Sequence, residues 1–363
     1  MTSKRLTEEI DPFIGPVDGE ALIDHLEKTI NDHLVLPNGA AEALTLWLLC
    51  AYCINNFRIY PKLFIFSPMK RCGKTTALEV LSGFAPRSLL VSGITPAVVF
   101  RVIEKEQPTL MVDEADQHLK HASGDMTAIL NSGHTKSTAF ILRCKPKSLE
   151  TEQFSTWGPM VIAAIGTIQS TIMDRSITIP LQRMTIQQKT TIKKIPYDFV
   201  DQMLVTRQKL LKWSQDNETN CKTILITPPD IGNIRAQDNW EPLFKIASLI
   251  SPKWLLKCEN AYRLLEARKD CSDPRDLLLK DIQIILLSYQ GANITSEDMI
   301  SALTADSDSF WTEYNAGRPI TPRGLAAMLK DFGIKPKTIR QKSNANNRGY
   351  EVSDFDDAFK RYI

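Results

Sequence analysis

Two stretches of the sequence carry residues whose types and spacing are suited to phosphate chemistry. The first, SPMKRCGKTT at residues 67–76, follows the apolar run 63–66 and precedes a helical pattern that starts at Ala77. A strand, a loop and a helix in this order are typical of a phosphate-binding P-loop, because the loop N–H groups and the helix dipole favour an anion. The residues expected to bind nucleotide here are Ser67, Pro68, Met69, Lys70, Arg71, Cys72, Gly73, Lys74, Thr75 and Thr76.

Within this loop, Lys74 is expected to reach the outer phosphates, and the hydroxyl of Thr75 to take a place on Mg²⁺. The usual pattern begins with glycine five residues before Gly73, and this chain has Pro68 there. Because proline lacks an N–H group and fixes φ, the chain must turn differently at the start of the loop.

The second stretch is TLMVDEAD at residues 109–116, a short apolar strand followed by acids. Asp113 is expected to order Mg²⁺ and its water shell, and Glu114 to polarise the attacking water. Lys74 and Asp113 are 39 residues apart, which leaves room for a strand at 87–91 and a helix at 95–106. The two motifs together predict a site for ATP and Mg²⁺, whereas a chance GKT followed by a surface acidic cluster is the alternative.

Two positions beyond the acidic strand are candidates for contact with the γ-phosphate. Thr167 follows the apolar strand 160–165 and is a candidate sensor of that phosphate. Arg175 precedes an alternating strand, and its guanidinium suits the charge on a transferring phosphoryl group. We therefore expect Arg175 to be an arginine finger that reaches the nucleotide of a neighbouring subunit, with a salt bridge to Asp174 or another acid as the alternative.

The region from about 187 to 290 has a largely helical pattern and is expected to form a small lid beside the nucleotide. Arg235 lies near the start of a helix in this region and is a candidate to reach the phosphates from the lid. A structural bond to Asp238 explains its presence equally well.

Two basic segments are candidates for nucleic-acid contact. The first extends from the core as a predicted strand pair or loop and carries Lys136, Arg143, Lys145 and Lys147, with no acid before Glu150. The second lies near the carboxyl end, where residues 318–348 hold eight Lys or Arg and a single acid, Asp331. Such a surplus is typical of a phosphate-backbone binder. The residues expected to contact DNA there are Arg323, Lys335, Lys337, Arg340, Lys342 and Arg348.

The alternative for the first segment is a solvated basic loop, and for the second a module that docks protein. Two helices followed by a basic loop make residues 291–363 similar to a winged helix. The predicted division of the 363 residues is a helical extension at 1–40, a P-loop ATPase core at 41–186, a helical lid at 187–290 and the winged-helix-like module. The expected fold class is α/β, with an ASCE or AAA+-like core in which a strand separates the P-loop strand from the acidic strand.

Composition narrows the range of functions. The formal net charge is +2, so the chain is nearly neutral. Any affinity for nucleic acid must therefore come from local basic patches and not from the global charge. We expect no secretory signal and no membrane span, because the longest apolar run, near residues 44–54, is too short. Seven scattered cysteines are typical of reduced thiols, and a cytoplasmic location is expected.

Ordered blocks along residues 44–363 resemble a bacterial family of domains of unknown function, found in phage, plasmid and integrative-element proteins beside primase or helicase modules. The resemblance implies a P-loop ATPase of mobile-element replication, and Pro68 looks like the family's own variant. No primase-type acidic cluster is visible, so a primase partner would be another chain. The blocks are SPMKRCGKTT, TPAVVFRVIEKEQPTLMVDEAD, ILNSGH, VIAAIGTI, DRSITIPLQR, RAQDNWEPLFKIA and GYEVSDFDDAFKRYI.

Three functions compete at this stage. The first is a DNA-dependent motor, a helicase or translocase, which acts as a ring or other oligomer because Arg175 needs a neighbour's nucleotide. The second is a non-motor ATP switch that loads or regulates a primase or another replication protein, or acts in anti-phage defence. The third is a DEAD-box-like helicase, suggested by residues 113–116, but the remaining residues do not supply a second motor domain.

Overall fold

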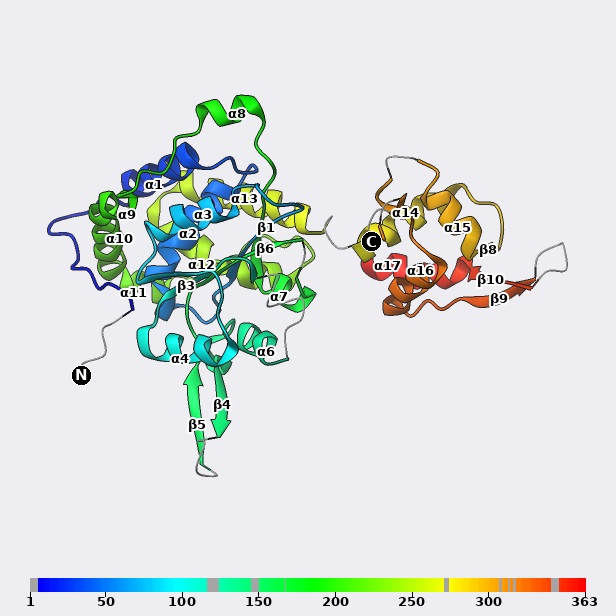
Figure 1. The fold of residues 1–363 in the computed structure, drawn as a ribbon, viewed down its shortest axis with the longest axis horizontal. Helices are drawn as coiled ribbons and strands as arrows, with labels where there is room; N and C mark the ends of the chain where they lie inside the picture. Colours follow the sequence, from blue (N-terminus) through cyan, green and yellow to red (C-terminus); the bar gives the residue numbers. More distant parts are fainter. Residues whose placement is uncertain are drawn as a thin grey trace. The chain divides into compact units, whose positions relative to one another are not determined.

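The computed structural model describes residues 6–115, 124–144, 150–166, 168–270, 274–306, 309–312, 314–315, 318–340 and 346–363. These residues form two compact units, Met1–Glu266 and Ala267–Ile363 (Figure 1). Both units combine helices and strands, so the α/β fold class predicted from the sequence is confirmed. The finer division at residues 40, 186 and 290 stays a prediction.

The first unit is built on a five-stranded sheet in the order β2-β3-β6-β1-β7, in which every neighbouring pair is parallel. The sequence predicts a strand between the one that precedes the loop and the acidic one, and β6 occupies that position between β1 and β3. The strands are β1 (Lys62–Ser67), β2 (Ser88–Val91), β3 (Thr109–Val112), β6 (Met160–Ile165) and β7 (Ser176–Pro180).

Helices cover both faces of this sheet, which explains why its inner strands are apolar almost without interruption. Successive side chains of β1 point to opposite faces: Leu63 and Ile65 pack in one core cluster, and Phe64 packs in the other. The first layer, which also contains the predicted amino-terminal helix, comprises α1 (Gly19–His33), α2 (Ala40–Tyr52), α3 (Lys74–Ser82), α9 (Phe199–Gln202), α10 (Leu204–Asp216), α11 (Glu218–Thr223), α12 (Ile234–Ile250) and α13 (Pro252–Asp270).

Within the range expected to form the lid, α9, α10, α11 and α12 lie in the same compact unit as the sheet. Trp240, Leu243 and Phe244 of α12 are buried in the core that also contains Leu44 of α2 and Ile177 of β7. The sequence pattern shows that α12 has an apolar face, but it does not show which element covers that face.

The second layer contains α4 (Pro96–Glu106), α6 (Gly124–Ser132) and α7 (Ser170–Asp174). The antiparallel strands β4 (Phe140–Cys144) and β5 (Thr151–Ser155) form an arm that projects from this side of the unit (Figure 1). A strand pair is one of the two forms that the sequence predicts for this segment. A further helix, α8 (Ile186–Thr191), follows β7, and 3₁₀ turns span Ile54–Asn56 and Lys136–Thr138.

The second unit packs helices on a three-stranded antiparallel sheet in the order β8-β10-β9. Its helix α14 falls within the predicted lid, but Leu278 and Leu279 of that helix pack with Tyr350 and Phe355 in the core of this unit. The elements are α14 (Pro274–Ser288), β8 (Asn293–Thr295), α15 (Ser296–Leu303), α16 (Pro322–Leu329), β9 (Lys337–Arg340), β10 (Asn346–Glu351) and α17 (Asp356–Tyr362), with 3₁₀ turns at Phe310–Thr312, Lys330–Phe332 and Val352–Phe355.

The close approach of β10 to its neighbours predicts a local effect of Gly349→Ala. A Cβ atom at this position would overlap the carbonyl oxygen of Ile294 and the side chain of Ile339. We expect a loss of roughly 1–3 kcal/mol of stability in the second unit, as for other overpacked sites. Hydrogen exchange should rise in peptides from 274–363 and stay unchanged in the first unit.

The matched control is Gly324→Ala, because the nearest atom to a Cβ there is the Thr321 hydroxyl oxygen at 3.4 Å. This change is expected to be neutral or slightly stabilising, since alanine favours a helix. Unchanged exchange in Gly349→Ala would contradict the packing described for β10.

Candidate functional site

The loop at residues 68–73 joins the carboxyl end of β1 to the first turn of α3. Gly73 has a φ of 86°, and a Cβ atom added there would meet nothing within 4 Å, so glycine is required by backbone conformation and leaves open space above it. At the start of the loop, the Ser67 hydroxyl donates to the carbonyl of Met69 at 2.7 Å. This bond closes the turn around Pro68, which has no N–H group to contribute.

Lys74 folds back over the loop that precedes it. Its Nζ atom donates to the Ser67 hydroxyl oxygen at 2.7 Å. The ammonium group is thereby held over a backbone loop at the amino end of α3, where a helix attracts anions.

The acidic strand meets the same helix. The Thr75 hydroxyl donates to Oδ2 of Asp113 at 2.8 Å, and Oδ1 of Asp113 accepts from the backbone N–H of Glu114 at 2.9 Å. Glu114 has a φ of 50°, in the left-handed region that non-glycine residues seldom adopt. The structure thus brings the two predicted metal ligands into direct contact, with Glu114 beside them.

These residues surround a pocket of about 410 Å³. Of the predicted loop residues, Ser67, Pro68 and Met69 are not in its lining, although Ser67 is tied to Lys74. Thr167 lies outside the described residues. The lining comprises Lys70, Arg71, Cys72, Gly73, Lys74, Thr75, Thr76, Asp113, Glu114 and Ile165. Sequence reasoning missed Ile165, although its position at the carboxyl end of a strand beside β1 is a usable signal.

The pocket offers few protein ligands to a cation. In the described part of the chain, no three His, Cys, Asp or Glu side chains lie together as a metal site. The Thr75 hydroxyl and the Asp113 carboxylate would supply two oxygen ligands, directly or through water, and the rest would come from water and phosphate. Mg²⁺ is commonly bound in this way, so the residues present fit Mg²⁺ with a phosphorylated ligand.

Arg175 lies at the opposite edge of the sheet from this pocket. It precedes β7, and the pairing of Ser176 with Lys62 places it beside the amino end of β1. Ser67 lies five residues beyond Lys62 along β1, which corresponds to roughly 17 Å. Arg175 donates from Nη1 to the carbonyl of Thr171 at 2.8 Å. It does not line the pocket, and Asp174 pairs with Arg235 and not with Arg175.

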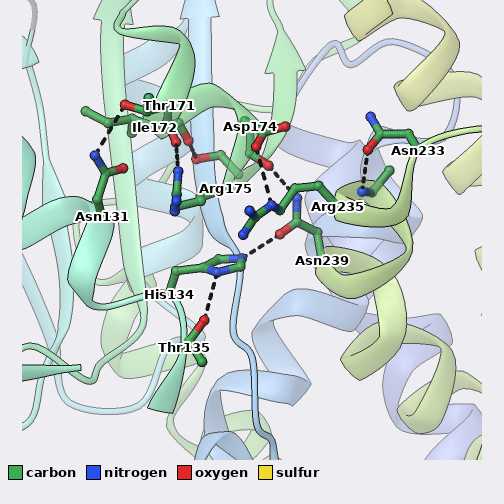
Figure 2. A network of polar contacts seen from close by, with 12 residues as sticks. Asn131, His134, Thr135, Thr171, Ile172, Asp174, Arg175, Asn233, Arg235 and Asn239 are labelled. Atoms are coloured by element: carbon green, nitrogen blue, oxygen red, sulfur yellow. Dashed lines mark hydrogen bonds and ion pairs between the residues drawn. The ribbon is translucent and has the colours of Figure 1, made fainter. Parts of the chain in front are cut away.

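Arg235 does not form the bond to Asp238 that the sequence offers as an alternative, and it is not in the pocket lining. Its Nε atom lies 3.4 Å from Oδ2 of Asp174, and Asp238 pairs instead with Arg58 at 3.2 Å. Arg235 is thereby joined to the residue that precedes Arg175, as Figure 2 shows, and it does not line the pocket of its own chain. The reason is that α12 packs against β7 and α2, so its first turn comes to the amino edge of the sheet.

A buried polar network links these elements and was not expected from the sequence. Asn239 donates from Nδ2 to the carbonyl of Asp174, and its Oδ1 lies 2.8 Å from Nε2 of His134 (Figure 2). This pattern requires His134 to carry its proton on Nε2, while Nδ1 faces the Thr135 hydroxyl at 3.3 Å. Burial, followed by the charges of nearby cations, lowers the pKa of His134 to about 4, so the ring is neutral near pH 7.

Lys62 is the most unfavourably placed charge of this region. It is 3% exposed, and its Nζ atom has no hydrogen-bond partner among the described residues. Burial, with the charge of Arg175 as a smaller cause, lowers the pKa of Lys62 to about 7. Burial is the main cause of both lowered pKa values, and the charge of Arg175 is a smaller cause in each case.

The predicted nucleic-acid contacts of the arm are partly engaged in protein contacts. Lys136 donates to the carbonyl of Asn55 at 2.7 Å, and Arg143 pairs with Asp125 at 3.5 Å. Lys145 and Lys147 lie outside the described residues. The described part of the arm thus leaves less unpaired charge for DNA than the sequence suggests.

In the second unit, Arg323, Lys335 and Arg348 are exposed. Lys337, in contrast, lies 3.1 Å from Glu351 and 2.8 Å from Asp354. Arg340 ends β9, and its side chain is outside the described set, as is the whole of Lys342. Arg323, Lys335 and Arg348 therefore remain as available cations.

Comparison with known proteins gives two similarities. Residues 196–362 match a family described as a protein of unknown function (DUF3631). A stretch of 131 residues, 35% of this chain, is 26% identical to a protein of Saccharopolyspora erythraea named an uncharacterized 28.9 kDa protein in the xis 5′ region. The match covers about half, 49%, of that relative. Both agree with the resemblance to a family of unknown function, and no described helix is long and apolar enough to cross a membrane.

The burial of Lys62 predicts a pH-dependent gain of stability in Lys62→Met. The pKa of this lysine is about 7 in the folded chain and 10.5 ordinarily, so its contribution to stability is present above pH 10.5 and lost as pH falls toward 7. Because one pKa unit corresponds to about 1.4 kcal/mol, the variant should be more stable at pH 7 by on the order of a few kcal/mol. Urea unfolding of the variant and the parent at pH 7 and pH 10 measures this difference in unfolding free energy.

The difference in unfolding free energy between Lys62→Met and the parent should become much smaller at pH 10, where the lysine of the unfolded chain also begins to lose its proton. Lys222→Met is the control, since Lys222 is exposed in an ion pair with Glu218 one helical turn away. Its effect should be small at both pH values. A Lys62→Met variant that is less stable than the parent at pH 7 would contradict the described burial.

Proposed function

We propose that this chain is a Mg²⁺-dependent ATPase of the P-loop type. The observation that carries the proposal is the 2.8 Å hydrogen bond from the Thr75 hydroxyl to Asp113, in a pocket that also contains Lys74 and Glu114. The strand order supports it, because β6 separates β1 from β3 as in ASCE and AAA+-like cores. The pocket volume of about 410 Å³ also lies within the range of sites that hold small molecules.

Four side chains and the loop backbone of the pocket have proposed roles in the hydrolysis of ATP. Lys74 exchanges its bond to Ser67 for the outer phosphates, whose negative charge it neutralises. Thr75 and Asp113 would hold Mg²⁺, which would supply positive charge to neutralise that of the phosphates. The Glu114 carboxylate accepts a hydrogen bond from the attacking water and orients it in line with the γ-phosphate. The loop N–H groups around Gly73 contact the phosphate oxygens.

Arg175 completes the site only when a second copy of the chain is present. A distance of roughly 17 Å along β1 separates its level from Ser67, far more than one arginine side chain spans. We therefore propose that Arg175 contacts the nucleotide of a neighbouring subunit, and that the active form is a ring or another oligomer.

The preferred use of this ATPase is as a DNA-dependent motor, a helicase or translocase of a mobile genetic element. The order helix, strand, helix, helix, strand, strand in the second unit supports a winged helix, which would bind DNA through its exposed cations. The relative from the xis 5′ region supports the mobile-element setting. A primase or another replication protein is the proposed partner.

A non-motor ATP switch is the second candidate. The observation that favours it is the engagement of Lys136 and Arg143 in protein contacts, which weakens the arm as a track for a DNA strand. ATPase rates with and without single- and double-stranded DNA separate the two, since a motor should be accelerated by the strand on which it moves.

The proposed roles of Lys74 and Glu114 predict two different defects. Lys74→Ala should lose ATP binding, because the ammonium that neutralises the phosphates is gone. Glu114→Gln should still bind ATP but turn it over at least about 100-fold more slowly, a typical loss for a removed general base. Filter binding of labelled ATP and a phosphate-release assay give the two readouts.

Lys222→Ala, at an exposed site far along the chain from the pocket residues, is the control and should behave as the parent. Normal turnover in Glu114→Gln would remove the proposed role of this carboxylate. Normal ATP binding in Lys74→Ala would contradict the proposed role of the lysine.

The second unit predicts which cations set DNA affinity. Arg348→Ala should weaken DNA binding and reduce the salt slope by about one, because one phosphate contact is lost. Lys337→Ala should change the DNA affinity and the salt slope much less, because the Lys337 ammonium already pairs with Glu351 and Asp354. Fluorescence anisotropy of a labelled duplex at several salt concentrations compares the two, and an equal effect of both changes would contradict the assignment.

A further inference from the structure

Two arginines from segments far apart in the sequence lie together at the amino edge of the sheet. Asp174 is adjacent to Arg175 in the chain and lies 3.4 Å from Nε of Arg235. Figure 2 shows Arg235 directed at Asp174 and Arg175 directed at the carbonyl of Thr171, with His134 below them in the view. Neither arginine lines the pocket of its own chain, which opens at the other edge of the sheet.

The charge at this edge is unbalanced. Among the described residues, Asp174 is the carboxylate that pairs with Arg235, whereas Arg175 donates from Nη1 to the uncharged carbonyl of Thr171. The buried amine of Lys62 is only partly charged near pH 7, because its pKa is lowered to about 7, so the positive potential comes mainly from the two guanidinium groups. An anion that approached from outside would therefore be attracted to this edge.

Both arginines are accessible to such an anion. The side chain of Arg235 is 38% exposed, and Arg175 is half-buried. The ion pair between Asp174 and Arg235 is long and partly exposed, so exchanging this carboxylate for a stronger anion would require little free energy.

A rigid frame holds the two arginines in place. Asn239, which is fully buried, bonds the carbonyl of Asp174 and the ring of His134, each at 2.8 Å. The side chain of Asn233 caps the start of α12 by accepting from the N–H of Ala236 at 3.1 Å. The first turn of α12 is therefore fixed to the segment that carries Arg175.

We infer that Arg235 acts together with Arg175 on the terminal phosphate of a nucleoside triphosphate held in the pocket of a second copy of the chain. Asp174 holds Arg235 in place until that phosphate replaces the carboxylate. This inference rests on the proposed ATPase function and revises the expected role of Arg235, which becomes a contact between subunits in place of one within the lid.

The experiment mixes two inactive variants. Lys74→Ala lacks a working pocket but retains both arginines, whereas Arg235→Ala retains the pocket but lacks one arginine. We expect Arg235→Ala alone to bind ATP with parental affinity and to hydrolyse it at least about tenfold more slowly, since arginine fingers contribute to turnover. An equimolar mixture should hydrolyse ATP much faster than either variant alone.

Several outcomes would overturn the inference. A mixture no faster than its components would indicate that Arg235 acts within its own chain or only supports the fold. Parental turnover of Arg235→Ala alone would show that this arginine has no role in hydrolysis. Arg58→Ala removes another exposed arginine that is paired with an acid of α12, and it should match the parent.

Parental turnover is measured first, which keeps the two proposals distinguishable. If the parent chain does not hydrolyse ATP, the proposed function fails; if it does, the variants bear on Arg235 alone. Should Arg235→Ala not fold, Arg235→Lys takes its place in the mixture. Lysine can keep the pair with Asp174 but lacks the planar fork of donors, so the same recovery is expected.

Discussion

The hydrogen bond between the Thr75 hydroxyl and Asp113 joins the start of α3 to the end of β3 at 2.8 Å. The strands that lead to these residues, β1 and β3, are not neighbours, because β6 lies between them. The contact therefore depends on the order of the whole sheet and on the parallel direction of its strands, which brings their carboxyl ends to one edge. The pocket forms where these carboxyl ends meet.

The two edges of the sheet differ in charge and in packing. The carboxyl edge has an open loop, the ammonium of Lys74 and two carboxylates, and it is the proposed site of the metal and the nucleotide. The amino edge has two arginines and a buried lysine that lacks a partner among the described residues. Keeping Lys62 there costs stability near pH 7. A function for that positive edge is a reason to retain such a residue.

The strands could be predicted from the sequence, as could the meeting of residues 70–76 with Asp113 and Glu114, because both depend on local patterns. An apolar run followed by a loop or by acids defines β1, β3 and their ends. The partners of Arg235 and Asn239 were not predictable, since they depend on how α12 packs against β7. Helical periodicity shows which face of a helix is buried but not what covers it, and for this reason the sequence does not show that α14 packs in the core of the second unit.

The central claim is that Lys74, Thr75 and Asp113 together hold ATP with Mg²⁺. Calorimetric titration of ATP into the purified chain, with Mg²⁺ and then with the metal chelated, tests it most directly. The account predicts one nucleotide per chain and clearly weaker binding without the metal. Absence of binding in the presence of Mg²⁺, or binding that is indifferent to the metal, would contradict it.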